Sequence, residues 1–262
     1  MRNKGMLFTL SAILLGGTLF AFSMTQNHLS KTYAASSSIL ALEKVASQSA
    51  NVEYNIQKTY KRVLGVGFDQ TGDELTINGT LPVSLAQYGL EMDHLRYFVN
   101  ATLPQTTFTQ NVPEVTSSHN ITFKHTSDIE AEFYLPPNTD QITFDAEFMG
   151  LINESQCNRS LTPGSVDISL NFKGQSPDDC NTPSGWKSNI SDTGTYIKMN
   201  QDKIKLTIDN NVLRLENDEP HQLNFTISIR VNESVVVRPL TLKGNVQTTI
   251  GQTTKSGVIR IQ

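Results

Sequence analysis

The stretch that decides the fold is Leu223–Val231, which reads Leu-Asn-Phe-Thr-Ile-Ser-Ile-Arg-Val. Every second residue is apolar, and every residue between two apolar ones is polar. Because side chains of a β-strand point alternately to its two faces, this pattern predicts a strand with one buried face and one solvated face. Such strands are typical of antiparallel sheets.

The same alternation recurs in residues 142–148, 166–172 and 204–208. Asp209-Asn210-Asn211 follows the last of these runs, and this composition is typical of a tight hairpin turn. Several short strands without intervening long helices predict an antiparallel β-sandwich over residues 65–262. The chain is therefore expected to be mainly β.

One segment of this region has a helical pattern instead. Leu85, Met92, Leu95 and Phe98 recur at helical spacings, which predicts a short helix over residues 84–99 that covers a sheet edge. Gly89 lies inside this segment and is unfavourable in a helix interior.

Residues 6–24 form a run of 19 residues without a charge. A helix of that length spans roughly 28 Å, close to the hydrocarbon thickness of a bilayer. Arg2 and Lys4 precede the run, so the positive-inside rule predicts a cytoplasmic N-terminus. We therefore expect a single-pass cell-membrane protein that contacts membrane lipid through residues 6–24 and has an extracellular C-terminal domain.

Residues 25–64 have the pattern of an amphipathic helical stalk. Its apolar seam consists of Ile39, Leu42, Val45, Val52, Ile56, Tyr60 and Val63. Either the chain's own β domain or neighbouring copies can cover this seam. Gly65 and Gly67 are expected to end the helix. The predicted parts are thus a leader with a transmembrane helix (1–24), a stalk (25–64) and an extracellular β-sandwich domain (65–262).

Charge is divided unevenly along the chain. Residues 1–64 hold seven Lys and Arg against two Glu, whereas the remainder holds 14 Lys and Arg against 23 Asp and Glu. An acidic head argues against nucleic acid as a partner, because binding phosphates requires a basic surface. No phosphate-binding loop or nucleophile elbow occurs in the sequence, so we expect neither an enzyme nor a cofactor.

The chain has two cysteines, Cys157 and Cys180. In an exported protein such an isolated pair predicts a disulfide, and the alternative is two free thiols. Neither cysteine has a second Cys or a His at the spacing of a metal site, so no metal is expected.

Eight Asn-x-Ser/Thr sequons follow residue 77, and their asparagines are Asn78, Asn100, Asn120, Asn153, Asn158, Asn189, Asn224 and Asn232. We predict that several carry glycans in the native host. The alternative is a surface rich in Asn and Thr that serves solubility.

The N-terminal sequence Lys4-Gly5-Met6-Leu7-Phe8-Thr9-Leu10 resembles the class III signal peptides of type IV pilin-like proteins, particularly archaeal ones. The resemblance covers about the first 25 residues. It implies that a prepilin-type peptidase cuts between Gly5 and Met6 and leaves the apolar helix on the mature protein. Leu10 stands where many bacterial pilins have Glu, although archaeal relatives often lack that Glu.

The resemblance implies a cell-surface structural or adhesion subunit that bundles with other copies of itself or with pilin-like subunits. Two alternatives remain open. An uncleaved anchor would make the chain a monomeric surface module that binds a glycan or a protein. Cleavage by an ordinary signal peptidase near Ala21-Phe22-Ser23 would release it as a secreted β-sandwich protein.

Overall fold

The computed structural model describes residues 3–117, 119–150, 157–160, 162–173, 187–232 and 240–261. Within these ranges, the side chains of residues 3–13, 35, 111, 112 and 173 are not described.

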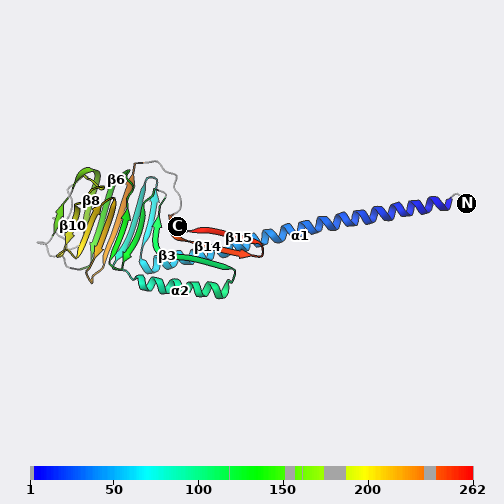
Figure 1. Cartoon of the computed structure of the whole chain (residues 1–262), viewed down its shortest axis with the longest axis horizontal. Coiled ribbons are helices and arrows are strands. Elements are labelled where there is room, and N and C mark those ends of the chain that lie inside the picture. The colour runs from blue at the N-terminus through cyan, green and yellow to red at the C-terminus, as the bar shows by residue number, and fades with distance from the viewer. Residues whose placement is uncertain are drawn as a thin grey trace.

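The N-terminal part is one continuous helix, α1 (Asn3–Leu64), of 62 residues. At 1.5 Å per residue it is about 93 Å long. Figure 1 shows that its last part lies beside β14 and β15, while the rest projects away from the β-rich head. The helix ends at Leu64 and is followed by Gly65, whose φ of 62° is the left-handed conformation that glycine accepts most easily. The predicted long helix and its glycine terminator are confirmed.

The prediction of a membrane span has to be corrected. Among the described residues, no helix is both long and apolar enough to cross a membrane. On α1, Met24 is soon followed by polar residues, namely Gln26, Asn27 and Lys31. On this finding the prediction of a single-pass cell-membrane protein with a cytoplasmic N-terminus is wrong.

The head contains two sheets. The six-stranded sheet has the order β1 (Gly67–Thr71), β2 (Glu74–Leu81), β13 (Leu223–Val231), β6 (Thr139–Phe148), β8 (Pro163–Lys173) and β9 (Lys187–Ser188). The nine-stranded sheet has the order β15 (Thr253–Ile261), β14 (Leu240–Ile250), β3 (Thr106–Thr116), β4 (Thr122–Ser127), β5 (Glu130–Tyr134), β12 (Val212–Asn217), β11 (Ile204–Asp209), β10 (Thr195–Met199) and β7 (Asn158–Ser160). A mainly β, predominantly antiparallel head is confirmed, although β6 and β8 pair in parallel.

The decisive stretch forms β13, an interior strand between β2 and β6. Its burial alternates without a break along Leu223–Val231, as the sequence predicts. The predicted turn after β11 is also present, and Asn210 and Asn211 both have positive φ values, 50° and 61°. Two successive left-handed residues are typical of the tight turns that join antiparallel strands.

Aromatic side chains link the two sheets. Phe133 of β5 is fully buried, and its ring centroid lies 5.0 Å from that of Phe123 and 6.1 Å from that of Phe225 on β13. The ring of Phe225 lies over Gly79 of β2, where an added Cβ would come within 2.6 Å of it. Residues of both sheets, α1 and α2 belong to one hydrophobic core.

The predicted short helix is α2 (Leu85–Thr102). The Ser84 hydroxyl accepts a hydrogen bond from the Gln87 amide at 3.2 Å, which is the N-cap arrangement. Tyr88, Met92 and Val99 are its buried residues. The helix packs on α1 and β3. Because β3 lies inside the nine-stranded sheet, α2 does not cover a sheet edge as predicted.

Candidate functional site

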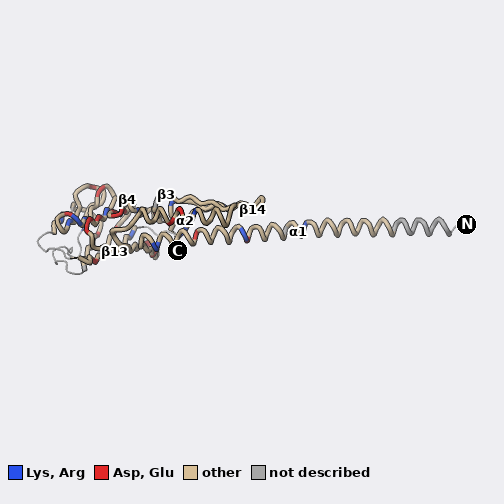
Figure 2. Tube along the Cα trace, turned by 90° about the horizontal axis from the view of Figure 1, so that it is seen from below, with Lys and Arg blue, Asp and Glu red and all other residues tan. Residues whose placement is uncertain are grey.

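The projecting part of α1 carries an unusual amount of exposed apolar surface. Between Leu14 and Leu42, eleven large apolar side chains are 51% to 72% exposed: Leu14, Leu15, Leu19, Phe20, Phe22, Met24, Leu29, Tyr33, Ile39, Leu40 and Leu42. Lys31 is the sole Lys, Arg, Asp or Glu in this range, and Figure 2 shows the sparse charge along the helix. Soluble monomers rarely leave so large an apolar surface in water, so this surface is a candidate interface.

The apolar seam predicted from the sequence is divided between the head and solvent. Val45, Val52, Ile56 and Tyr60 are at most 2% exposed, and Val63 packs partly buried against the same core. Ile39 and Leu42, in contrast, are 56% exposed. From Val45 onward, the chain's own head therefore covers the seam, which decides between the two coverings left open by the sequence.

Polar contacts hold the same end of α1 to the head. The Glu53 carboxylate accepts a hydrogen bond from the backbone amide of Arg260 in β15 at 2.8 Å. The Gln57 side chain donates a hydrogen bond to the backbone carbonyl of Arg260. Arg62 forms an ion pair with Glu91 of α2 at 2.9 Å. These contacts fix the direction in which the rest of the helix leaves the head.

A second apolar row lies on the other side of α1. It follows the positions Leu15, Leu19, Phe22, Gln26, Leu29, Tyr33, Ser36 and Leu40, whose spacings alternate between four and three residues. At 100° per residue, this row points roughly opposite to Val52 and Ile56, which face the head. Tyr54, two heptads after Leu40, continues the row and is 61% exposed although its neighbours on the seam are buried. We call the eight residues at these positions, from Leu15 to Leu40, the heptad row. A partner can approach it without competing with the head.

The sequon asparagines are spread over the head and do not form one cluster. Asn78, Asn100, Asn120, Asn158 and Asn232 are exposed, and Asn189 and Asn224 are half-buried. The Asn189 side chain is held locally, because it donates to Asp192 at 2.7 Å and accepts from the Ser191 amide at 3.0 Å. Asn153 lies outside the described residues. Glycosylation of these sites stays a prediction.

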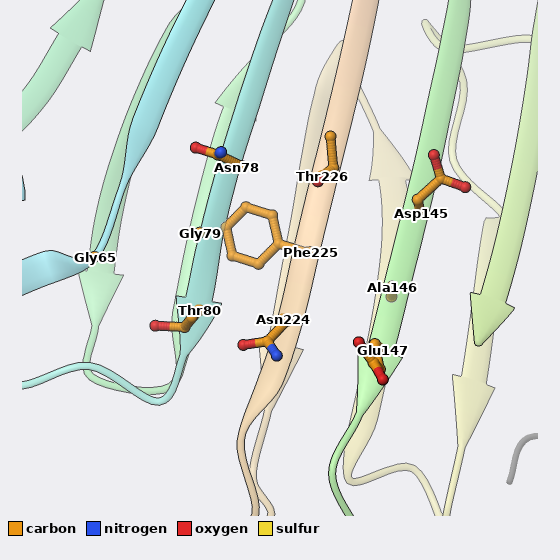
Figure 3. A pocket seen from close by; sticks show the side chains of 10 residues that line it. All are labelled: Gly65, Asn78, Gly79, Thr80, Asp145, Ala146, Glu147, Asn224, Phe225 and Thr226. Atoms are coloured by element: carbon orange, nitrogen blue, oxygen red, sulfur yellow. The ribbon is translucent and has the colours of Figure 1, made fainter. Parts of the chain in front are cut away.

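Two of these sequons pair with each other across adjacent strands. In the register of β2 and β13, Asn78 lies opposite Thr226, and Asn224 lies opposite Thr80. Together with Asp145 and Glu147 of β6, these four residues line a polar pocket of about 360 Å³, shown in Figure 3. The Asp145 carboxylate accepts a hydrogen bond from Asn171 at 2.9 Å. Hydroxyls, amides and carboxylates of this kind suit a ligand rich in hydroxyl groups, or the first sugar of a glycan attached at Asn78 or Asn224.

The other predicted site residues give less information. Cys157 is disulfide-bonded and packs against the core. Cys180 lies outside the described residues, so its pairing with Cys157 stays a prediction. Lys4, Gly5 and Met6 lie in the first turns of α1, and the cut between Gly5 and Met6 stays a prediction.

Metal chemistry finds no support in the part of the chain that the structure describes, where no group of three or more His, Cys, Asp or Glu could hold an ion. His119 and His125 have separate surroundings. The His119 ring pairs with the Gly72 carbonyl at 2.9 Å, whereas His125 is buried in β4 against Phe123.

No protein-family model, no curated protein and no solved structure shows a significant match to the chain. The function of the chain therefore has to be inferred from the geometry of its fold, of the heptad row and of the polar pocket.

Proposed function

We propose that the chain is a pilin-like structural subunit, in which the projecting part of α1 bundles with the same part of other copies and the head faces outward. The observation that carries this proposal is the heptad row, a line of exposed apolar side chains on a helix that is already held by its own head on the opposite side. The N-terminal resemblance to pilin-like proteins supports the same function.

The spacing of the heptad row favours another copy as the partner. Apolar residues separated alternately by three and four positions allow two like helices to pack along a common seam. Gln26 and Ser36 are polar residues at two of these positions, and polar residues inside such a seam fix the register and orientation of the helices at some cost in stability. Identical helices satisfy this requirement because each Gln26 meets its equivalent in a parallel pair.

More than one neighbour is needed to cover the first described turns. Phe20 and Met24 are 65% and 61% exposed, and they point away from the heptad row because they lie at other angles around the helix. A helix with apolar residues on all sides is typical of the interior of a bundle. We therefore propose a bundle of several helices, as in a fibre, with the heptad row as one of its contacts.

For the head we propose the β-sandwich arrangement, in which the six-stranded and nine-stranded sheets face each other. The contact between Phe133 and Phe225 supports it, because each ring belongs to a different sheet and both are buried. Such a head would display its sequons on the outside of the assembly. These include the two sequons that line the polar pocket on β2 and β13.

The proposal is tested by placing a charge in the heptad row. We expect the full chain to sediment as species larger than a monomer, and Leu29→Glu to weaken association by about 100-fold or more, because a carboxylate would be buried without a partner. Asn27→Glu is the matched control, since it adds the same charge two residues away on the opposite side of the helix. Sedimentation velocity over a range of concentrations measures the effect.

Crosslinking provides a second readout for the same surface. Leu29→Cys should form a disulfide between copies under mild oxidation, because identical positions of a parallel seam face each other, and Asn27→Cys should not. A chain that stays monomeric at all concentrations, or two glutamate variants that sediment alike, would show that the proposal is wrong.

A further inference from the structure

The side of α2 that faces away from the core carries a second exposed row. Its members follow one another at spacings of four, three and four residues, as in the heptad row, and all are exposed: Leu90, His94, Tyr97 and Ala101. Leu90 is 56% and Tyr97 is 78% exposed. The buried residues of α2 lie on its opposite side. We call these four residues the α2 row, and nothing in the described part of the chain covers it.

The charged residues beside the α2 row already have partners within the chain. On one side, Asp93 and Arg96 form an ion pair at 2.8 Å. On the other side, Glu91 pairs with Arg62 of α1 at 2.9 Å and accepts a hydrogen bond from Gln87 at 3.2 Å. The row itself contains no Asp, Glu, Lys or Arg. An apolar centre with a polar rim is typical of protein interfaces, and this one suits an uncharged partner surface.

The projecting part of α1 has such a surface outside the heptad row. Phe20 and Met24 are 65% and 61% exposed, and they lie one helical turn apart, so both can face one partner. Residues 14–30 contain no Lys, Arg, Asp or Glu. In the proposed bundle, the seam along the heptad row leaves these two side chains uncovered.

The chain's own α2 cannot reach these side chains. The ion pair with Glu91 places α2 level with Arg62 of α1, at the end of the helix that is bound to the head (Figure 1). Met24 lies 38 residues before Arg62 on the same continuous helix, which is a distance of about 57 Å. An α2 row that covers Met24 therefore has to belong to another copy.

We propose that the α2 row of one copy packs against Phe20 and Met24 of a neighbouring copy. Leu90 and Tyr97 supply the apolar contacts, and the one-turn spacing of Phe20 and Met24 allows the two helices to interdigitate. This inference rests on the proposed function, because the neighbouring α1 has to belong to the same bundle.

The contact explains how a bundle can grow into a fibre. It joins two different surfaces, so it is heterologous, and each copy still offers its own α2 row to the next one. In a neighbour that runs in the same direction, Met24 lies level with Arg62 of the first copy, which shifts the two copies by about 57 Å along the helix. The heptad row joins identical positions and by itself gives a closed bundle.

Tyr97→Glu tests this growth without changing the heptad row. We expect the full chain to form fibres, and the variant to lower the mass of chain in fibres at least about tenfold, because the contact would bury an unpaired carboxylate. Small bundles should remain. Phe98→Glu is the matched control, since Phe98 is 59% exposed on the same helix and lies about 100° around it from Tyr97. Negative-stain electron microscopy and sedimentation velocity measure fibres and bundles.

Crosslinking of mixed chains tests which surfaces meet. A short bismaleimide reagent should link Met24→Cys chains to Tyr97→Cys chains but not to Phe98→Cys chains, while Leu29→Cys in the heptad row reports on the bundle separately. Linkage through Leu29→Cys without the link between positions 24 and 97, or fibres of Tyr97→Glu like those of the unmodified chain, would overturn this contact and leave the proposed function standing. Absence of both links would overturn the proposed function and this contact with it.

Discussion

Replacing Phe133 by alanine is expected to lower the free energy of unfolding by about 3 to 5 kcal/mol. The side chain is fully buried and lies between Phe123 of its own sheet and Phe225 of the other sheet. Its removal loses the transfer free energy of the ring and leaves a cavity that rigid neighbouring strands cannot close. It also breaks two aromatic contacts that hold the sheets together.

Phe98→Ala provides the control for this variant. Phe98 is 59% exposed on α2, so the same chemical change there should alter the free energy of unfolding by less than about 0.5 kcal/mol. Urea unfolding of the full chain, followed by circular dichroism, measures both values. Similar losses for the two variants would contradict the role of Phe133 as the central side chain of the core.

The β elements could be predicted because their signal is local. In β13, the alternation of Leu223, Phe225 and Ile227 with polar residues specifies which face is buried, whatever the strand pairs with. Pairing partners and strand direction are not encoded in this way. The parallel pairing of β6 with β8 therefore had no signal in the alternation of residues 142–148 or 166–172.

The helix shows the same limit more clearly. The spacing of apolar residues in α1 predicts a buried seam, but it does not specify what covers that seam. Val52 and Ile56 have the same spacing whether they pack against the chain's own head or against another copy. The polar residues that fix the answer, Glu53 and Gln57, bond to Arg260, which lies about 200 residues later in the chain. Such a contact can be recognised after folding but has no pattern in the sequence.

The polar pocket on β2 and β13 illustrates why sites were harder to predict than elements. Asn78 and Asn224 were found as sequons, but their pairing with Thr226 and Thr80 depends on the register of two strands distant in sequence. Gly89 was read as a residue unfavourable to a helix. Gly89 is exposed on α2, and a Cβ at this position would meet nothing within 4 Å, so the packing of α2 gives no reason for a glycine there.

Acidification from pH 7 to pH 4 is expected to remove about 3 kcal/mol of stability through His125 alone. Burial lowers the pKa of His125 to about 4, and the nearby Asp128 carboxylate opposes this shift. The unfolded chain binds a proton at this residue near pH 6.5, whereas the folded chain does not until about pH 4. Because the unfolded state binds more protons in this window, stability falls as the pH falls from 6.5 to 4 and then stops changing.

A second group acts at lower pH and can be separated from the first. Burial raises the pKa of Glu132, but hydrogen bonds from Arg214, Tyr134 and Lys124 outweigh burial and hold this pKa at about 2. The stability that these contacts give the carboxylate is present above its unfolded pKa near 4.5 and is lost as the pH falls toward 2. The loss due to His125 is therefore largely complete before that of Glu132 begins.

His125→Leu isolates the effect of the histidine. The variant should lose about 3 kcal/mol less than the unmodified chain between pH 7 and pH 4, because residue 125 no longer takes up a proton on unfolding. At pH 7 it should be about as stable as the unmodified chain or more so, since it removes two unpaired ring nitrogens from the interior. His94→Leu, a change at an exposed position of α2, should keep the full pH dependence.

Urea unfolding at several pH values provides the comparison. Equal slopes for His125→Leu and the unmodified chain would mean that the ring is protonated in the folded protein near neutral pH, which requires a hydrogen-bond partner or a path to water that its burial in β4 does not provide.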